Sequence, residues 1–491
     1  MPGTAPIGKG VVPIAAAVAA QLIAFASGYG YHRDELYFVA AGHHLAVAYA
    51  DQGPLTPVIA RAMSEIAPDS LVVLRIPSAL AAGAVVLLTG LLARELGGRE
   101  RAQLIAAASA AVGVIVLFTG HLLETSTFDL LAWTAISWLV IRAVRTGHRG
   151  LWLVAGGVLG IALLNKPLPA FLALGLLGGI LISGPRRRLR DPYLWLGAAL
   201  ALALFAPWLI WQAEHGWPQL DVSRSIAEGE STSAEAWWAV VPFQFLLISP
   251  LLAPVWIAGL VRLLRDPTVR EFRFLAWAWV ILAVVFMATR GKPYYLAGLL
   301  PVLLSAGAVS IDEWLDRGRS RARFAVLATA VLASAVVDAV IALPVLPARD
   351  ADVPVALNED VGETIGWPRF ARTVAGVYDE LPSPHRAVIL TGTYGEAGAI
   401  DRYRTGLGLP PAYSGHNAYG YWGPPPSGLA PVITIGLNPV DRAEHLRDCR
   451  FATRVDDGVG IDNDEQGTPI YVCAGPRRSW PVEWPGLRHL G

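Results

Sequence analysis

The sequence predicts a polytopic α-helical membrane protein with a small α/β domain at its C-terminus. Of its 491 residues, 54% are hydrophobic and only 16% are charged, and the mean hydropathy is +0.47. Soluble domains carry about 25% charged residues, so this chain has too few to cover a soluble surface of its length. The composition therefore excludes a disordered chain, a small disulfide-rich protein and an ordinary cytosolic enzyme.

The charges divide the chain into two parts of opposite sign. Lys+Arg and Asp+Glu both total 39, and the lack of a basic surplus argues against a nucleic-acid partner. Residues 1–346 hold 26 basic and 21 acidic residues, whereas residues 347–491 hold 13 and 18. We therefore expect a multi-span membrane domain over 1–346, including an outer loop at 30–70, and a separate domain over 347–491.

The apolar segments predict about eleven transmembrane helices, because a helix needs roughly 20 apolar residues to cross the hydrocarbon core. The first segment, Val11 to Tyr29, lacks an Ala-x-Ala-like cleavage site, so we expect it to be retained as a span. The predicted spans are centred near residues 20, 82, 110, 136, 157, 175, 202, 250, 281, 302 and 335.

Arginine and lysine predict the orientation, because cytoplasmic loops are enriched in them. One alternating set of loops contains nineteen basic residues and the opposite set contains six. The N-terminus is therefore expected in the cytoplasm of a cell whose plasma membrane holds the chain, and an odd number of spans places 347–491 outside. Cys449 and Cys473 both lie in this outer part, where a disulfide is expected, with two free buried thiols as the alternative.

The outer loop at 30–70 carries acidic residues at the end of an apolar span. Asp34 and Glu35 open a periodic stretch, Leu36 to Ala48, which predicts an amphipathic helix at the membrane interface. Asp51 and Gln52 then precede Gly53-Pro54, which breaks this pattern. Asp34 and Asp51 are candidates for substrate chemistry, and each could instead cap a helix.

A second acidic segment, His121 to Asp129, lies between the predicted third and fourth spans. Asp129 enters the apolar run that follows, where an ionisable residue is costly and marks a functional candidate. His121 and Glu124 are candidate substrate-binding residues. An N-cap of the fourth span is the alternative role for Asp129.

Lysine usage indicates a site for an anionic group. The chain has three lysines against 36 arginines, and Lys166 and Lys292 both precede a proline in loops of the outer set. Arg290, Tyr294 and Tyr295 neighbour Lys292. Cations at this face suit a lipid phosphate, and lysines snorkelling at helix ends are the alternative. Carboxylates that accept a proton, beside cations that stabilise a leaving phosphate, suit group transfer from a lipid-linked phosphate.

These motifs resemble glycosyltransferase family 39, whose members have the GT-C fold and include dolichyl-phosphate-mannose protein mannosyltransferases and lipid A aminoarabinose transferases. The resemblance spans nearly the whole chain. It rests on His-Arg-Asp34-Glu35-Leu-Tyr, Tyr49-Ala-Asp-Gln-Gly-Pro-Leu-Thr-Pro, Asp129, Gly291-Lys-Pro-Tyr-Tyr-Leu, Tyr394-Gly-Glu-Ala-Gly-Ala-Ile and Ser414-Gly-His-Asn-Ala-Tyr-Gly-Tyr-Trp-Gly-Pro-Pro. Many relatives have two prolines where this chain has Gly53-Pro54. The loop at 51–54 is therefore expected to differ in shape from theirs.

The resemblance implies a membrane glycosyltransferase that inverts the anomeric carbon. The donor would be a polyprenyl-phosphate sugar and the acceptor a hydroxyl of a glycan, lipid or protein. Asp34, with Glu35 beside it, would be the general base, and Asp129 would support it. Two carboxylates could also hold a divalent cation, although no His/Asp spacing demands one. The remaining candidates are Lys292, Arg290, Lys166, Tyr294 and Tyr295 for the donor phosphate, and Asp51, Gln52, His121 and Glu124 for the substrate.

The outer part, 347–491, alternates strand-like and helical patterns. Strands are expected at 387–390, 431–435 and 468–472, and helices near 396–404 and 440–447. The turn at 391–395 resembles a phosphate loop but lacks its Gly-Lys-Ser/Thr ending, so turn chemistry is expected there. An aromatic stretch could line a sugar or acceptor cleft or pack onto the membrane domain; it consists of His416, Tyr419, Tyr421 and Trp422.

A membrane transporter of an anionic or lipid-linked substrate is the main alternative function, because broken helices and intramembrane charges also mark transport pathways. The sequence shows no convincing internal repeat. Its ionisable residues gather at one face, with Asp338 as the main exception. These two features favour the transferase.

Overall fold

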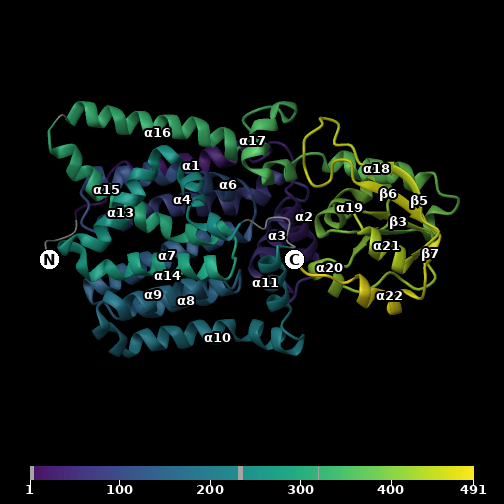
Figure 1. Ribbon diagram of the computed structural model, residues 1–491, viewed down its shortest axis with the longest axis horizontal. Helices are drawn as coiled ribbons and strands as arrows, with labels where there is room; N and C mark the ends of the chain where they lie inside the picture. Colours follow the sequence, from purple (N-terminus) through teal and green to yellow (C-terminus); the bar gives the residue numbers. More distant parts are fainter. Residues whose placement is uncertain (1–4, 230–235, 319) are drawn as a thin grey trace. The chain divides into compact units, whose positions relative to one another are not determined.

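The computed structural model describes residues 5–229, 236–318 and 320–491 (Figure 1). The chain forms two compact units. Unit 1 comprises Met1–Ala26, Arg75–Trp211 and Ile226–Leu343, and unit 2 comprises Ser27–Leu74, Gln212–Ser225 and Pro344–Gly491. The predicted division near residue 346 assigned loop 30–70 to the membrane domain, whereas in the structure this loop is part of unit 2.

Unit 1 is helical, and each of the predicted span centres falls in one of its helical segments. Six of the described helices are long and apolar enough to cross a membrane, and two bent helix pairs raise that number to eight. Three shorter apolar helices, α1, α8 and α9, accompany them. The helices are α1 (Val11–Phe25), α4 (Leu71–Glu95), α5 (Glu100–Ala111), α6 (Val114–His121), α7 (Thr125–Thr146), α8 (Gly150–Leu163), α9 (Pro169–Ser183), α10 (Pro192–Glu214), α12 (Phe243–Ile248), α13 (Ala253–Arg265), α14 (Arg273–Ala288), α15 (Leu300–Asp316) and α16 (Ser320–Ala342).

Two of the predicted spans are bent. Between α5 and α6 the axis turns by 57°, and the segment Trp237–Ile248 meets Pro250–Arg265 at 93°. The second bend lies at Ser249, whose φ is +108° and which precedes Pro250. A residue before proline is pushed out of the helical region, and proline itself has no N–H to continue the ladder. The sequence therefore explains where this span breaks.

Small residues allow the helices of unit 1 to pack closely. Gly259 of α13 lies so close to α15 that a Cβ on it would overlap the carbonyl oxygen of Leu303. In the same way, a Cβ on Gly307 of α15 would overlap the carbonyl oxygen of Val255 in α13. Close backbone approach at small residues is typical of helices that associate in lipid. The candidate membrane spans among the described helices lie in unit 1, apart from a few residues at the ends of two of them.

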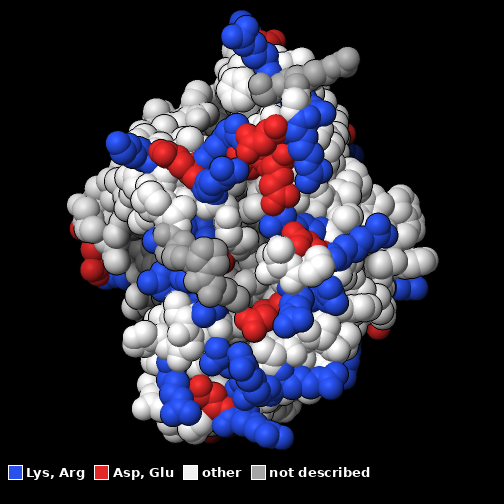
Figure 2. All heavy atoms as spheres, turned by 90° about the vertical axis from the view of Figure 1, so that its left-hand side faces the viewer, with Lys and Arg blue, Asp and Glu red and all other residues white. Residues whose placement is uncertain are grey.

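One end of unit 1 is rich in arginine. Figure 2 shows many Lys and Arg side chains, with acidic side chains among them, on the face at the left of Figure 1. Several arginines of the positive-rich loops form ion pairs, including Arg142 with Glu95 at 2.9 Å and Arg262 with Glu313 at 2.9 Å. These loops are the ones that the sequence predicts to be cytoplasmic.

Unit 2 contains a five-stranded sheet in the order β2-β1-β3-β6-β5, in which β2, β1 and β3 are parallel and β6 and β5 are antiparallel to their neighbours. The predicted strands and helices of the outer part are confirmed within a few residues. A disulfide joins Cys449 and Cys473, as expected. The strands are β1 (Val388–Thr391), β2 (Ala412–Ser414), β3 (Val432–Ile435), β5 (Arg450–Arg454) and β6 (Pro469–Cys473), with a separate pair β4 (Leu446–Arg447) and β7 (Gly475–Pro476).

The helices of unit 2 come from both halves of the chain, and α2 packs against α19. The interface helix predicted over 36–48 is shorter than expected, because the hydroxyl of Tyr49 donates to the carbonyls of Ala41 and His44 and ends α2 at His43. The helices are α2 (Arg33–His43), α3 (Leu55–Ile66), α11 (Pro218–Glu228), α17 (Asp352–Leu357), α18 (Trp367–Asp379), α19 (Tyr394–Leu407), α20 (Asn417–Tyr421), α21 (Pro439–His445) and α22 (Trp480–Leu487).

Candidate functional site

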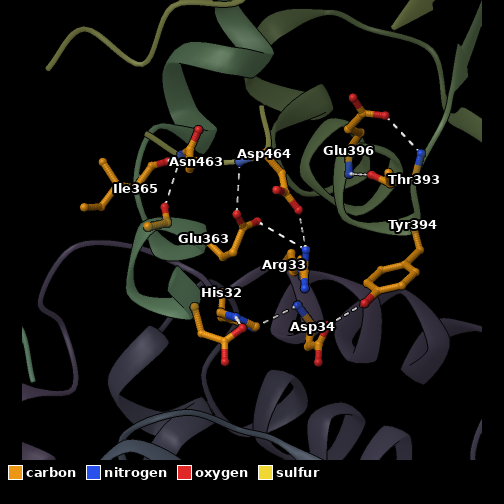
Figure 3. Close-up of polar contacts among 12 residues, drawn as sticks. His32, Arg33, Asp34, Glu363, Ile365, Thr393, Tyr394, Glu396, Asn463 and Asp464 are labelled. Atoms are coloured by element: carbon orange, nitrogen blue, oxygen red, sulfur yellow. Dashed lines mark hydrogen bonds and ion pairs between the residues drawn. The ribbon is translucent and has the colours of Figure 1, made fainter. Parts of the chain in front are cut away.

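A capping box fixes the start of α2. His32 is the N-cap residue, and its Nδ1 accepts a hydrogen bond from the backbone N–H of Asp34 at 3.2 Å (Figure 3). The carboxylate of Glu35 accepts from the backbone N–H of His32 at 2.9 Å and is completely buried. The alternative role of Asp34 as an N-cap is therefore wrong, because His32 caps the helix. Glu35 has a structural role at this helix start.

Asp34 instead points its carboxylate toward α19. The hydroxyl of Tyr394 donates to Oδ1 of Asp34 at 2.7 Å (Figure 3). Burial raises the pKa of Tyr394 well above its usual value, and the charge of Asp34 raises it further. The tyrosine therefore stays protonated and acts as the donor of this bond.

Asp51 forms a second carboxylate–tyrosine pair beside the first. The hydroxyl of Tyr37 donates to Oδ1 of Asp51 at 2.7 Å, and Nδ2 of Asn417 donates to Oδ2 at 3.4 Å. Burial raises the pKa of Asp51 to about 6, against the hydrogen bond from Tyr37, which lowers it. The alternative role of Asp51 as a helix cap is wrong, because Pro54 occupies the N-cap of α3 and no side chain caps it.

Gln52, the other candidate of this loop, is buried, and its backbone carbonyl accepts from the N–H of Tyr49 at 3.1 Å. This backbone bond closes the turn that carries Asp51. The structure therefore places Gln52 next to the second carboxylate–tyrosine pair along the chain.

Arg33, a basic residue of the outer loop at 30–70, forms ion pairs with acidic residues of the C-terminal segment. Its Nη1 lies 2.8 Å from Oδ2 of Asp464 and 3.7 Å from Oε2 of Glu363 (Figure 3). Burial raises the pKa of Glu363 to about 7, and the charge of Arg33 opposes that rise. Arg33 thus ties the start of α2 to this part of unit 2.

The aromatic stretch after β2 packs inside unit 2. The hydroxyl of buried Tyr419 donates to Oδ2 of Asp401 at 2.9 Å. Trp422 stacks on His44 with ring centroids 4.2 Å apart. Both contacts lie within unit 2, so the cleft lining and the packing onto the membrane domain both stay predictions.

In unit 1, Asp129 and Lys166 come together with two tyrosines. Asp129 lies inside α7 and not at its N-cap, which is Glu124, so the alternative capping role is wrong. Its Oδ1 is buried without a hydrogen-bond partner among the described residues, and the charge of Lys166 acts on this carboxylate. The Nζ atom of Lys166 lies 5.3 Å from the ring centroid of Tyr294 and 5.0 Å from that of Tyr295, distances typical of cation–π contacts.

The other two cations lie in the loop that leads to these tyrosines. Arg290 is exposed and has a φ of +51°, and Lys292 precedes the 3-10 helix η5 (Pro293–Leu299). The side chain of Gln244 donates to the carbonyl of Pro293 at 2.9 Å and holds the start of this helix. The predicted donor-phosphate residues therefore fall in two neighbouring groups of unit 1, one around Lys166 and one along residues 290–295.

The structure contains a buried arginine that was not predicted from the sequence as a site residue. Arg75 on α4 is only 1% exposed; its Nη1 donates to the carbonyl of Ala26 at 2.9 Å and lies 3.1 Å from Nε2 of His121. It was missed because it falls inside a predicted span and was counted in neither set of loops. The signal was present, since an arginine in an apolar run marks a functional candidate. His121 and Glu124 are both buried in this unit.

The candidate residues are divided between the two units. Unit 2 holds the carboxylate–tyrosine pairs, and unit 1 holds the cations and Asp129. Tyr37, Tyr394 and Asn417 belonged to the recognised motifs but were not singled out as site residues. Their partners are up to 366 residues away in the sequence, so spacing alone did not connect them.

Parts of the chain match a known family and a curated relative. Residues 51–211 match the family described as dolichyl-phosphate-mannose-protein mannosyltransferase. The chain is 30% identical over 278 residues to undecaprenyl phosphate-alpha-4-amino-4-deoxy-L-arabinose arabinosyl transferase 1 of Pseudomonas fluorescens, which covers 52% of this chain and 47% of that protein. The chain thus spans about half the length of this curated relative.

Solved structures share the fold over most of the chain. ArnT from Cupriavidus metallidurans bound to undecaprenyl phosphate aligns with a TM-score of 0.60 and 15% identity, covering 94% of this chain and 98% of that one. The archaeal oligosaccharyltransferase AglB from Archaeoglobus fulgidus, in complex with an inhibitory peptide and a dolichol-phosphate, aligns with a TM-score of 0.52 and 13% identity, covering 80% and 63%. The chain is therefore a multi-pass membrane protein with the GT-C glycosyltransferase fold. The family match over residues 51–211 agrees with the resemblance to glycosyltransferase family 39.

Proposed function

We propose that the protein transfers a sugar from a polyprenyl-phosphate-linked donor to a hydroxyl acceptor at the outer face of the membrane, with inversion at the anomeric carbon. The observation that carries this proposal is the fold shared over 94% of the chain with a transferase solved with undecaprenyl phosphate. The chain adds to it the two kinds of group that such a reaction needs, a carboxylate base and phosphate-binding cations. The acceptor belongs to the glycans, lipids or proteins of the cell envelope.

In the proposed reaction, the oxygen of the acceptor hydroxyl forms a bond to the anomeric carbon of the donor. The acceptor proton passes to the carboxylate of Asp34, which acts as the general base. The bond between the anomeric carbon and the phosphate oxygen breaks, and the phosphate leaves with the electron pair. Attack opposite to the leaving phosphate inverts the anomeric carbon.

Asp34 suits the role of base better than Glu35. Both oxygens of Glu35 belong to a completely buried carboxylate that caps α2, whereas Asp34 is only half-buried and its carboxylate takes no part in capping. Capping fixes the direction of α2 and thereby the place of Asp34. Glu35 therefore acts on the reaction only by holding the helix that carries the base.

The departing phosphate needs positive charge, and unit 1 provides it. Lys166 is placed by Asp129 and by the rings of Tyr294 and Tyr295. Lys292 and Arg290 add two further cations in the adjoining loop. Charge-assisted hydrogen bonds to phosphate are among the stronger polar contacts in proteins, so these residues are proposed to bind the donor phosphate and to stabilise the leaving group. Asp51, Gln52, His121 and Glu124 are proposed to contact the substrate.

The proposed orientation places the N-terminus in the cytoplasm and Pro344–Gly491 outside the plasma membrane. About eleven crossings are needed, which requires that the bent pairs and the shorter helices α1, α8 and α9 also span the bilayer. The arginine-rich loops and the disulfide between Cys449 and Cys473 support this orientation, because disulfides persist in oxidising compartments.

A transporter is the second candidate function, and the two bent helix pairs favour it. Both functions are tested by one experiment. The purified protein is reconstituted in liposomes with a panel of labelled polyprenyl-phosphate sugars and with envelope glycan, lipid and protein acceptors. Transfer predicts label on one acceptor class and release of polyprenyl phosphate. Movement of the label across the bilayer without release of polyprenyl phosphate would contradict the proposal and support transport.

A further inference from the structure

Two carboxylate–tyrosine pairs lie next to each other in unit 2. Tyr394 donates to Asp34 and Tyr37 donates to Asp51, each at 2.7 Å. The two tyrosine rings have centroids 4.6 Å apart and an interplanar angle of 31°. Asp34 and Tyr394 come from segments 360 residues apart, so the hydrogen bond exists only because α19 packs on α2.

The position of Tyr394 is fixed by the start of α19. Thr393 is the N-cap residue, and its hydroxyl accepts from the N–H of Glu396 at 3.2 Å, while the carboxylate of Glu396 accepts from the N–H of Thr393 at 3.0 Å (Figure 3). This capping box holds Tyr394, the first residue of the helix, in one orientation. The same device fixes Asp34 at the start of α2, so both members of the pair lie on capped helix ends.

Two glycines bring these helix ends together. A Cβ on Gly395 would lie 2.9 Å from Cβ of Arg33, and a Cβ on Gly398 would lie 2.9 Å from the carbonyl carbon of Leu36. Both glycines belong to the motif Tyr394-Gly-Glu-Ala-Gly that contains the tyrosine. The close approach of α19 to α2 is therefore built into the residues that carry Tyr394.

We propose that Tyr394 is a positioning residue for the general base, holding the Asp34 carboxylate through one oxygen so that the carboxylate takes the acceptor proton in a fixed orientation. This inference rests on the proposed function. A hydroxyl that donates to a carboxylate favours its ionised form, so the bond keeps Asp34 deprotonated before the acceptor arrives. Tyr394 itself neither gains nor loses a proton in the reaction.

Several other ionisable groups act on Asp34 and contribute to its titration. Tyr394 acts on the carboxylate by donating a hydrogen bond to its Oδ1 at 2.7 Å. Tyr394→Phe removes the hydroxyl and keeps all of these residues in the chain. These groups are His32 and Arg33 on its own helix start, Asp51 in the following loop and His416 after β2.

The test is the pH dependence of sugar transfer by Tyr394→Phe, which keeps the ring and removes the hydroxyl. We expect kcat to fall about tenfold, with the KM for the donor unchanged. The acid limb of the kcat profile should move to higher pH by about one unit, because loss of the hydrogen bond raises the pKa of the base. Each rate is divided by the amount of folded protein, which is measured from the monodisperse peak in size-exclusion chromatography.

Tyr419→Phe is the matched control, since it removes the same kind of buried hydrogen bond, from Tyr419 to Asp401, elsewhere in unit 2. It should leave the pH profile in place. Gly398→Ala is a second variant, which displaces the hydroxyl of Tyr394 without deleting it, and it should move the acid limb in the same direction as Tyr394→Phe.

The outcomes separate this inference from the proposed function. If Asp34→Asn is inactive but Tyr394→Phe keeps the wild-type rate and profile, the positioning role is overturned and the base assignment survives. A slower Tyr394→Phe whose acid limb has not moved would show a merely structural role and would also overturn it. Full transfer by Asp34→Asn would overturn the base assignment and this inference with it.

Discussion

The contact between α2 and α19 can be tested by a pair of glycine substitutions on one helix. Gly398 and Gly406 both lie in α19, but only Gly398 faces α2. A Cβ on Gly398 would lie 2.9 Å from the carbonyl carbon and from Cβ of Leu36 and 3.0 Å from its carbonyl oxygen, whereas a Cβ on Gly406 would meet nothing within 4 Å. Gly398→Ala should therefore strain the contact and Gly406→Ala should not.

The expected magnitudes follow from these distances. Two of the three close atoms at Gly398 are backbone atoms that cannot rotate away, so the steric cost should reach about 3 kcal/mol. Alanine has the better helix propensity and stabilises α19 by about 1 kcal/mol. The free energy of unfolding of Gly398→Ala should therefore fall by about 2 kcal/mol in total. Gly406→Ala has only the second term and should gain up to about 1 kcal/mol.

Thermal unfolding of the detergent-purified protein, followed by tryptophan fluorescence, measures both variants. For a unit of roughly 200 residues, 1 kcal/mol shifts Tm by about 2–4 °C. Gly398→Ala should lower Tm by about 4–8 °C and Gly406→Ala should raise it by about 2–4 °C. A Gly398→Ala variant as stable as the wild type would refute the tight contact that places Tyr394 at Asp34.

Three further predictions concern the donor site, the disulfide and the pH dependence of stability. Lys166→Ala should lower kcat/KM for the donor by about tenfold to a hundredfold in initial-rate assays, with Lys166→Arg recovering part of it; an unchanged donor kcat/KM would remove Lys166 from the phosphate site. Replacing Cys449 and Cys473 with Ser should destabilise unit 2 by about 2–4 kcal/mol, seen as a lower Tm that no longer responds to reductant; a Tm equal to the wild type would contradict this. Burial raises the pKa of Glu396 to about 7 in the folded protein, so its contribution to stability is complete below its unfolded pKa and is lost as the pH rises through 7. Glu396→Gln should reduce this loss by about 2–3 kcal/mol when Tm is compared at pH 5 and pH 8, and an unchanged slope would refute a neutral buried Glu396.

The helices of unit 1 could be predicted from hydropathy, because a membrane requires long apolar runs and each run is visible in the sequence. Their bends were harder to predict. The bend at Ser249 has a local cause in Pro250, but its 93° angle depends on what the two halves pack against. Loop 30–70 was assigned to the membrane domain because it adjoins a span, whereas its helices pack with the C-terminal segment through contacts that no local pattern encodes.

The candidate site was predictable in its residue types and only partly in its roles. Asp34 and Asp129 stood out because charges are rare and costly beside apolar spans, and Lys166 stood out because the chain has only three lysines. The distinction between Asp34 and Glu35 required the structure, since either residue could have capped α2. Tyr394 could not be assigned from spacing, because its partner is 360 residues away. Arg75 was missed because it lies inside a predicted span, and only the basic residues of the loops were counted.

The most direct measurement is sugar transfer by Asp34→Asn beside Glu35→Gln in the same liposomes, with the panel of labelled polyprenyl-phosphate donors. Size exclusion and Tm verify that each variant is folded. Asp34→Asn should reduce transfer by at least about a hundredfold, because its amide cannot accept the acceptor proton. Glu35→Gln keeps an oxygen that can accept the N–H of His32 and should retain most of the transfer. Full activity in folded Asp34→Asn, or equal loss in the two variants, would contradict Asp34 as the base of a lipid-phosphate-dependent sugar transfer.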